Sequence, residues 1–120
     1  MRILTEGQSL LVWGGVLSLA CAFAFFMRTY LCVREVFPVA FIAGYASSGL
    51  VDDYVWCDPV PRSARREYVV SHLFGLTAGG LFTAMFIDRG DAEPALAFGC
   101  LTGIGVTIVL FKCIKHRRRL

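Results

Sequence analysis

Four long stretches of the chain carry no charged residue, and the charged residues cluster between them. The uncharged stretches cover 7–27, 36–51, 68–87 and 94–111. A helix rises ~1.5 Å per residue, so about 20 residues cross the ~30 Å hydrocarbon core of a bilayer. The second stretch is short, since its sixteen residues cover roughly 24 Å. The pattern predicts an all-α transmembrane helical bundle with four helices as two hairpins, or three helices if the second stretch does not span.

The limits of these helices follow from the charges and aromatic residues at their ends. Interfacial aromatic residues are expected where a span meets the headgroups, and Tyr30, Tyr54, Trp56 and Tyr68 occupy such positions. No convincing cleavage site precedes Arg28, so we expect the first stretch to be an anchor and not a signal peptide. The whole chain, 1–120, is expected to form one integral membrane domain with a basic tail over 113–120. The expected spans are about 8–28, 35–53, 67–87 and 94–112.

Composition agrees with a membrane protein. Hydrophobic residues make up 57% of the 120 residues and charged residues 18%, and the mean hydropathy is +0.64. Soluble domains average about 45–50% apolar and about 25% charged residues. So short a chain cannot bury that apolar excess in a soluble core. This excludes a disordered or collagen-like chain and argues against a soluble enzyme, and the five cysteines show no pattern of a disulfide framework.

The basic residues predict the orientation. With four spans, nine lysines and arginines lie on one side and three on the other; with three spans the division is ten against two and the N-terminus lies outside. Basic residues favour the cytoplasmic or matrix side. Both arrangements therefore place the central loop and the C-terminus on that side, and the charge count does not decide between them.

Small residues recur at every fourth position in all four stretches. Residues four apart lie on one helix face, and small side chains let a second backbone approach closely within a bilayer. These faces are expected to pack either against the chain's own helices or against helices of other membrane subunits. The helix-packing candidates are Gly14, Ser18, Gly44, Ser48, Gly75, Gly79, Gly99 and Gly103.

His72 is the one titratable side chain, cysteines apart, within an uncharged stretch. An ionisable group inside the membrane is a candidate for haem ligation, proton transfer or quinone contact. His72 also lies about one turn from the charged segment Arg65–Glu67, where it can form an interfacial hydrogen bond. The first stretch lacks the carboxylate of small multidrug exporters, and the chain lacks the asparagines of small fluoride channels. Ion-coupled transport by this chain alone is therefore not expected.

Charged residues gather in the central loop and in the tail. Three aspartates of the loop lack a calcium-binding pattern, and we expect a proline-braced turn that offers charge pairs to a neighbour. We find no phosphate-binding loop, nucleophile–base pair or metal site, so no catalytic residue, cofactor, nucleic acid or small-molecule substrate is expected. A juxtamembrane basic cluster is typical of contact with anionic lipid such as cardiolipin. The headgroup candidates are Lys112, Lys115, Arg117, Arg118 and Arg119.

One segment resembles a known family. It reads Phe41-Ile42-Ala43-Gly44-Tyr45-Ala46-Ser47-Ser48-Gly49-Leu50-Val51-Asp52-Asp53, followed by a proline-containing loop and by Arg65-Arg66 at the next helix start. This is similar to the helical hairpin of the C-two family of small accessory (supernumerary) subunits of mitochondrial NADH:ubiquinone oxidoreductase, complex I. The likeness covers about a third of the chain. It departs from the family by one extra serine, by Asp53 where the family has asparagine, and by additional hydrophobic stretches at both ends.

The resemblance implies a supernumerary inner-membrane subunit without catalytic residues, and a second stretch that spans. We therefore expect a non-catalytic accessory subunit of a mitochondrial respiratory-chain complex, with its central loop and C-terminus on the matrix side. One alternative is a haem- or quinone-associated membrane anchor that uses His72. Another is a small homo-oligomeric channel or carrier.

Overall fold

The computed structural model describes residues 3–38 and 48–120, with the side chains of 48–50 left aside. Its helices are α1 (Glu6–Val36), α3 (Ser48–Tyr54), α4 (Arg62–Arg89), α5 (Ala92–Lys115) and the short 3-10 helix η1 (Arg117–Arg119). These ranges contain no strand, which confirms the all-α class for the described part of the chain. By length and composition, α1, α4 and α5 are each able to cross a membrane.

Each long helix begins and ends at a residue suited to that position. Thr5 and Gln8 form a reciprocal capping box at the start of α1, which satisfies two backbone donors that have no partner within the helix. Pro61 precedes α4, and Gly90 ends it with a left-handed φ of 76°, a conformation that glycine adopts without steric cost. The turn into α5 is consequently short, and the two helices form a hairpin.

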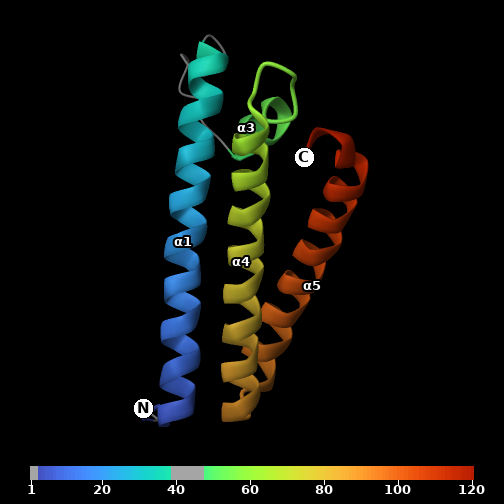
Figure 1. Cartoon of the computed structure of the whole chain (residues 1–120). Coiled ribbons are helices and arrows are strands. Elements are labelled where there is room, and N and C mark those ends of the chain that lie inside the picture. Colours follow the sequence, from blue (N-terminus) through green and yellow to red (C-terminus); the bar gives the residue numbers. More distant parts are fainter. Residues whose placement is uncertain (1–2, 39–47) are drawn as a thin grey trace.

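The three long helices lie in one layer with α4 in the middle (Figure 1). α1 runs antiparallel to α4 along most of its length, and α5 packs on the other side of α4. α5 lies close to α4 near their connecting turn and leans away from it toward its C-terminus. The N-terminus lies at the end of the layer with the α4–α5 turn, and α3 lies with the C-terminus at the opposite end (Figure 1).

Polar contacts mark two levels along the layer. At one end, Gln8 Nε2 donates to Asp88 Oδ2 at 2.8 Å. At the other, Arg28 forms an ion pair with Glu67 at 3.1 Å. Twenty residues of helix separate Gln8 from Arg28, a distance of ~30 Å that equals the thickness of a hydrocarbon core. The uncharged parts of the three helices therefore occupy one slab of membrane thickness.

The predicted second span, 35–53, is the part of the expected fold that is not confirmed. Its residues 39–47 lie outside the described residues, so the four-helix arrangement as two hairpins stays a prediction. The flanks are described: Phe37 ends α1 outside helical geometry, and its ring lies 4.9 Å from that of Tyr54. One straight helix from 37 to 54 would hold these residues ~25 Å apart.

Candidate functional site

The most fully packed part of the described chain lies at the end of the layer that holds α3. Its buried residues come from the end of α1, from α3 and the following loop, and from the start of α4. These residues are Val33, Val51, Val55, Trp56, Val60, Ala64 and Tyr68. By contrast, only 6% of the apolar window of α1, 17% of that of α4 and 6% of that of α5 are buried. The most deeply buried residues of the described chain thus gather at one end of the layer.

Polar side chains surround this packed end, and we call them the Trp56 cluster. Its members are Asp52, Trp56, Arg65, Tyr68, Lys112, His116 and Arg119. Arg65, in the first turns of α4, is only 5% exposed. Its guanidinium donates to the carbonyl oxygens of Val55 at 3.3 Å, Cys57 at 2.7 Å and Arg119 at 3.0 Å. Five fixed donors in one plane allow such a contact to three separate carbonyls, so Arg65 joins the loop after α3 to the C-terminal tail.

Asp52 makes the second connection of the cluster. It accepts a hydrogen bond from Tyr68 Oη at 2.8 Å and forms an ion pair with Lys112 of α5. Burial by itself would raise the pKa of Asp52, but the hydrogen bonds from Lys112 and Tyr68, together with the Lys112 charge, outweigh it and lower the pKa below its usual 3.8. One ionised carboxylate therefore ties α3 to both α4 and α5.

Trp56 fills the space that opens where α5 leans away from α4. Its indole stacks on His116 with 4.2 Å between the ring centroids and meets Tyr68 edge-on at 6.1 Å. Burial, and then the charges of Lys115 and Arg119, lower the pKa of His116, which favours the neutral ring in this stack. Trp56 is 6% exposed, and its Nε1 has no hydrogen-bond partner among the described residues.

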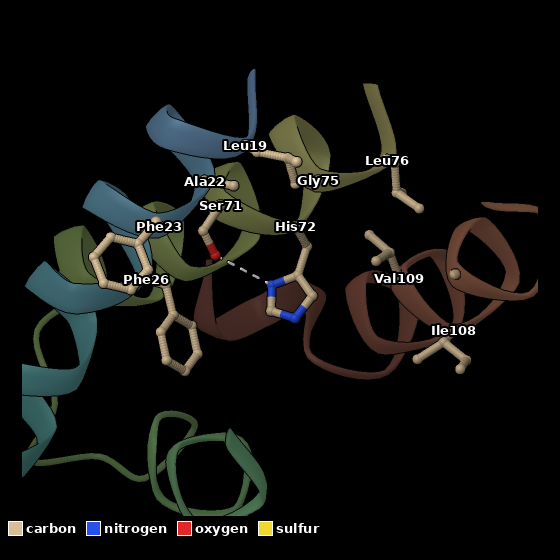
Figure 2. A pocket seen from close by; sticks show the side chains of 11 residues that line it. Leu19, Ala22, Phe23, Phe26, Ser71, His72, Gly75, Leu76, Ile108 and Val109 are labelled. Atoms are coloured by element: carbon tan, nitrogen blue, oxygen red, sulfur yellow. Dashed lines mark hydrogen bonds between the residues drawn. The ribbon is translucent and has the colours of Figure 1, made fainter. Parts of the chain in front are cut away.

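A groove of about 590 Å³ runs between the three long helices next to this cluster. We call it the His72 groove. Figure 2 shows its lining, in which Ser71 and His72 are the polar side chains: Leu19, Ala22, Phe23, Phe26, Ser71, His72, Gly75, Leu76, Gly105, Ile108 and Val109. His72 Nδ1 lies 2.8 Å from the carbonyl oxygen of Tyr68, four residues earlier on α4. This contact lies within α4, and the expected hydrogen bond of His72 at the membrane interface stays a prediction.

The small residues selected from the sequence divide into two groups. A methyl group on Gly14 would lie 3.2 Å from Leu81, one on Gly99 would lie 3.5 Å from Thr83, and one on Gly79 would overlap the Thr102 hydroxyl. These three glycines therefore lie where helices of this chain approach each other. Gly75 and Gly103 have nothing within 4 Å of that position.

Three further small residues complete the comparison. Ser18 on α1 is half-buried. Gly44 lies outside the described residues, and so does the side chain of Ser48, whose backbone begins α3. Gly15 and Gly105 were not selected, although a methyl group would come within 2.8 Å of Phe82 and 2.7 Å of Leu76, respectively. For Gly15 the sequence did hold a signal of close packing, namely its position beside Gly14. Two adjacent glycines destabilise a long helix unless they have a packing role.

The basic residues selected for lipid contact also divide into two groups. Lys112 pairs with Asp52, and Arg119 donates to the carbonyl oxygen of Trp56. Lys115, Arg117 and Arg118 are exposed and remain able to contact headgroups. The sequence did not single out Arg65 or Trp56 as structural centres, because Arg65 reads as one of several solvated basic residues and Trp56 as an interfacial aromatic.

The described residues hold no group of three or more histidine, cysteine or carboxylate side chains that could bind a metal ion. The two histidines serve different neighbours, since His72 faces the groove and His116 stacks on Trp56. Comparison with protein-family models, with curated proteins and with solved structures finds no match to this chain. The features that bear on function are therefore the Trp56 cluster, the His72 groove and the open helix faces.

Proposed function

We propose that this chain is a non-catalytic subunit that packs into a larger membrane assembly. The supporting observation is that, among the described residues, α1 and α5 pack chiefly against α4, and α1 makes a few further contacts with α3. Small residues such as Gly103 lie on these open faces with nothing within 4 Å. In a bilayer, helices associate through close backbone approach at small residues and not through a hydrophobic drive. The open faces are thus suited to helices of partner subunits.

The Trp56 cluster serves this function as a rigid end piece. Arg65 and Asp52 hold the loop after α3 and the tail against α4 and α5, so the chain presents a defined surface at one membrane face. The exposed Lys115, Arg117 and Arg118 are placed to contact anionic headgroups, such as those of cardiolipin. Asp52 is paired inside the chain, and the charge pairs expected between the loop and a neighbouring subunit stay a prediction.

We further propose three membrane spans, formed by α1, α4 and α5, with α3 at the headgroup level. The ring contact of Phe37 with Tyr54 supports this arrangement. It places ten basic residues on the side of α3 and two on the side of the α4–α5 turn, a positive-inside distribution. The N-terminus is then outside, and the C-terminus lies on the matrix or cytoplasmic side.

The resemblance of 39–80 to the accessory subunit of complex I suggests the kind of assembly, although the three-span arrangement proposed above departs from the spanning second stretch that this resemblance implies. On this basis we propose a mitochondrial respiratory-chain complex of the inner membrane as the host. The chain itself supplies no redox group in this proposal. Its contribution is to fill a helix position at the edge of the complex.

The test compares two leucine substitutions on a native gel after mild detergent extraction. Gly103→Leu places a large side chain on an open face of α5, where an added Cβ has nothing within 4 Å among the described residues. Gly7→Leu is the matched control. Gly7 is equally open, and it lies in the first turn of α1, outside the part of the helix that packs within the membrane. We expect wild type and Gly7→Leu to migrate in a large assembly and Gly103→Leu to shift toward the free chain. Migration of wild type as a free chain, or an unchanged assembly with Gly103→Leu, would contradict the proposal.

A further inference from the structure

The side of α1 that faces away from α4 carries a regular pattern. On the α4 side, Gly15 is buried against the Phe82 ring. On the far side, exposed or half-buried apolar residues follow one another at alternating intervals of three and four. Residues seven apart shift by only ~20° around a helix, so these positions form one continuous line, which we call the α1 seam. Its members are Leu10, Trp13, Leu17, Ala20, Ala24, Met27 and Leu31.

The α1 seam has the spacing of helices that pack along their whole length. Alternating intervals of three and four are those of the a and d positions of a left-handed coiled coil. Ala20 and Ala24, near the middle of the seam, let a second backbone approach closely. Leu10, Leu17 and Leu31 are each more than half exposed and supply apolar surface on either side of them. The seam is thus suited to a helix that runs beside α1 across the bilayer.

Two opposite charges lie at the end of the α1 seam. Arg34 and Glu35, in the last turn of α1, are both exposed, and neither forms a salt bridge among the described residues. Consecutive residues lie about 100° apart on a helix, so Arg34 lies at one edge of the seam and Glu35 at the other. Neighbours in sequence do not face each other on a helix. These two charges therefore need partners on another helix.

A second copy of the chain supplies both partners at once. All copies of a membrane protein insert with one orientation, so two α1 helices that meet are parallel. A two-fold axis between them sets the left edge of one seam against the right edge of the other. Arg34 of each copy then lies at the same height as Glu35 of the other, and two ion pairs form. A lipid tail or an uncharged helix offers nothing to this pair of charges.

We propose that two copies of this chain pair along the α1 seam, as a parallel dimer whose Arg34 and Glu35 form reciprocal ion pairs at the headgroup level. The proposal rests on the proposed function, because it names the partner of one open face and leaves that of α5 to other subunits. Glu6 lies on the same side at the other end of α1 and is exposed. Its repulsion between the two copies is screened by salt at the membrane surface.

The test measures energy transfer between donor-labelled and acceptor-labelled copies of the purified chain in bicelles, over a range of dilutions. Arg34→Glu makes both edges of the seam acidic, and Glu35→Arg makes both edges basic. We expect each variant alone to pair about tenfold more weakly than wild type, as the loss of two exposed ion pairs implies. A mixture of the two variants, and the double variant Arg34→Glu/Glu35→Arg, should pair as well as wild type.

Two substitutions within the membrane separate this dimer from the larger assembly. Ala24→Leu overpacks the middle of the seam and should weaken pairing by about fivefold or more. Gly103→Leu lies on the open face of α5 and should leave pairing unchanged, although it is expected to disrupt the assembly on the native gel. Absence of energy transfer in wild type would overturn the dimer, and so would single charge variants that pair as wild type, a mixture that pairs no better than either variant alone, or full pairing by Ala24→Leu. None of these outcomes alters the expected mass of the native assembly, so the two proposals fail independently.

Discussion

The contact between Gly79 of α4 and Thr102 of α5 allows a sharp test of how the layer is packed. A methyl group on Gly79 would overlap Thr102 Oγ1 and lie 3.4 Å from Thr102 Cβ. The threonine hydroxyl is held by a hydrogen bond to the Phe98 carbonyl at 2.7 Å. Rotation of the Thr102 side chain about χ1 could bring Cγ2 into the place of Oγ1, but this would set a larger methyl group against the new methyl on Gly79. The remaining χ1 rotamer of threonine is rare in helices. Gly79→Ala therefore forces α5 away from α4.

The magnitude follows from a matched control one residue away. Gly80→Ala lies on the same helix and meets nothing within 4 Å. Both substitutions gain up to ~1 kcal/mol of helix propensity, so this gain cancels in the comparison. Overpacking of a close contact costs typically about 1–3 kcal/mol. We expect Gly79→Ala to be less stable than Gly80→Ala by that amount, with unfolding measured by steric trapping in bicelles.

A second substitution identifies the cause. Thr102→Ala removes the hydroxyl that the new methyl group meets, so it should restore most of the stability of Gly79→Ala and give a coupling energy in a double-mutant cycle. Equal stability of Gly79→Ala and Gly80→Ala would refute the α4–α5 contact. A loss that Thr102→Ala does not relieve would refute the assigned cause.

Three further predictions concern the Trp56 cluster and the topology. Arg65→Met should destabilise the chain by about 3 kcal/mol or more in the same assay, because buried carbonyls lose their donors at ~1–3 kcal/mol each, whereas Arg66→Met should have a small effect. The pKa of Asp52 is lower in the folded chain than its usual 3.8. The ionised carboxylate therefore stabilises the folded state above pH ~3.8, and this stabilisation is lost as the pH falls through the folded-state pKa. Asp52→Asn should remove this acid-dependent loss of stability, measured by tryptophan fluorescence. An impermeant thiol reagent should label Cys32 and Cys57 from the same side of sealed vesicles, because α3 and the end of α1 lie at the same end of the layer.

Each of these has a contrary outcome. Equal stability of the Arg65 and Arg66 variants would show that the carbonyl contacts do not hold the cluster. An acid transition unchanged by Asp52→Asn would assign it to other carboxylates. Labelling of the two cysteines from opposite sides would establish that the stretch 36–51 spans.

The long helices could be predicted from the sequence because charge is excluded from a bilayer core. The uncharged stretch 68–87 lies within α4 and 94–111 lies within α5, since one charged side chain at mid-membrane costs enough to set a boundary. The short helix α3 could not be separated from a span in the same way. Residues 36–51 are uncharged whether they cross the membrane or lie at its face.

The packing partners of the small residues could not be predicted, because a fourfold spacing identifies a helix face but not what lies opposite. Gly75 and Gly79 belong to one stripe, yet Gly79 meets Thr102 while Gly75 lines the groove. Arg65 was equally hidden, since one of the carbonyls that holds it lies 54 residues away in the chain.

The place of this chain in a larger membrane assembly is tested most directly by purification. The measurement is the mass and composition of the tagged chain isolated from its native membranes in mild detergent. We expect stoichiometric co-purification with other membrane proteins, at a mass several times that of the 13.2 kDa chain. A monodisperse species that contains only this chain, alone or as a homo-oligomer, would contradict the proposed function.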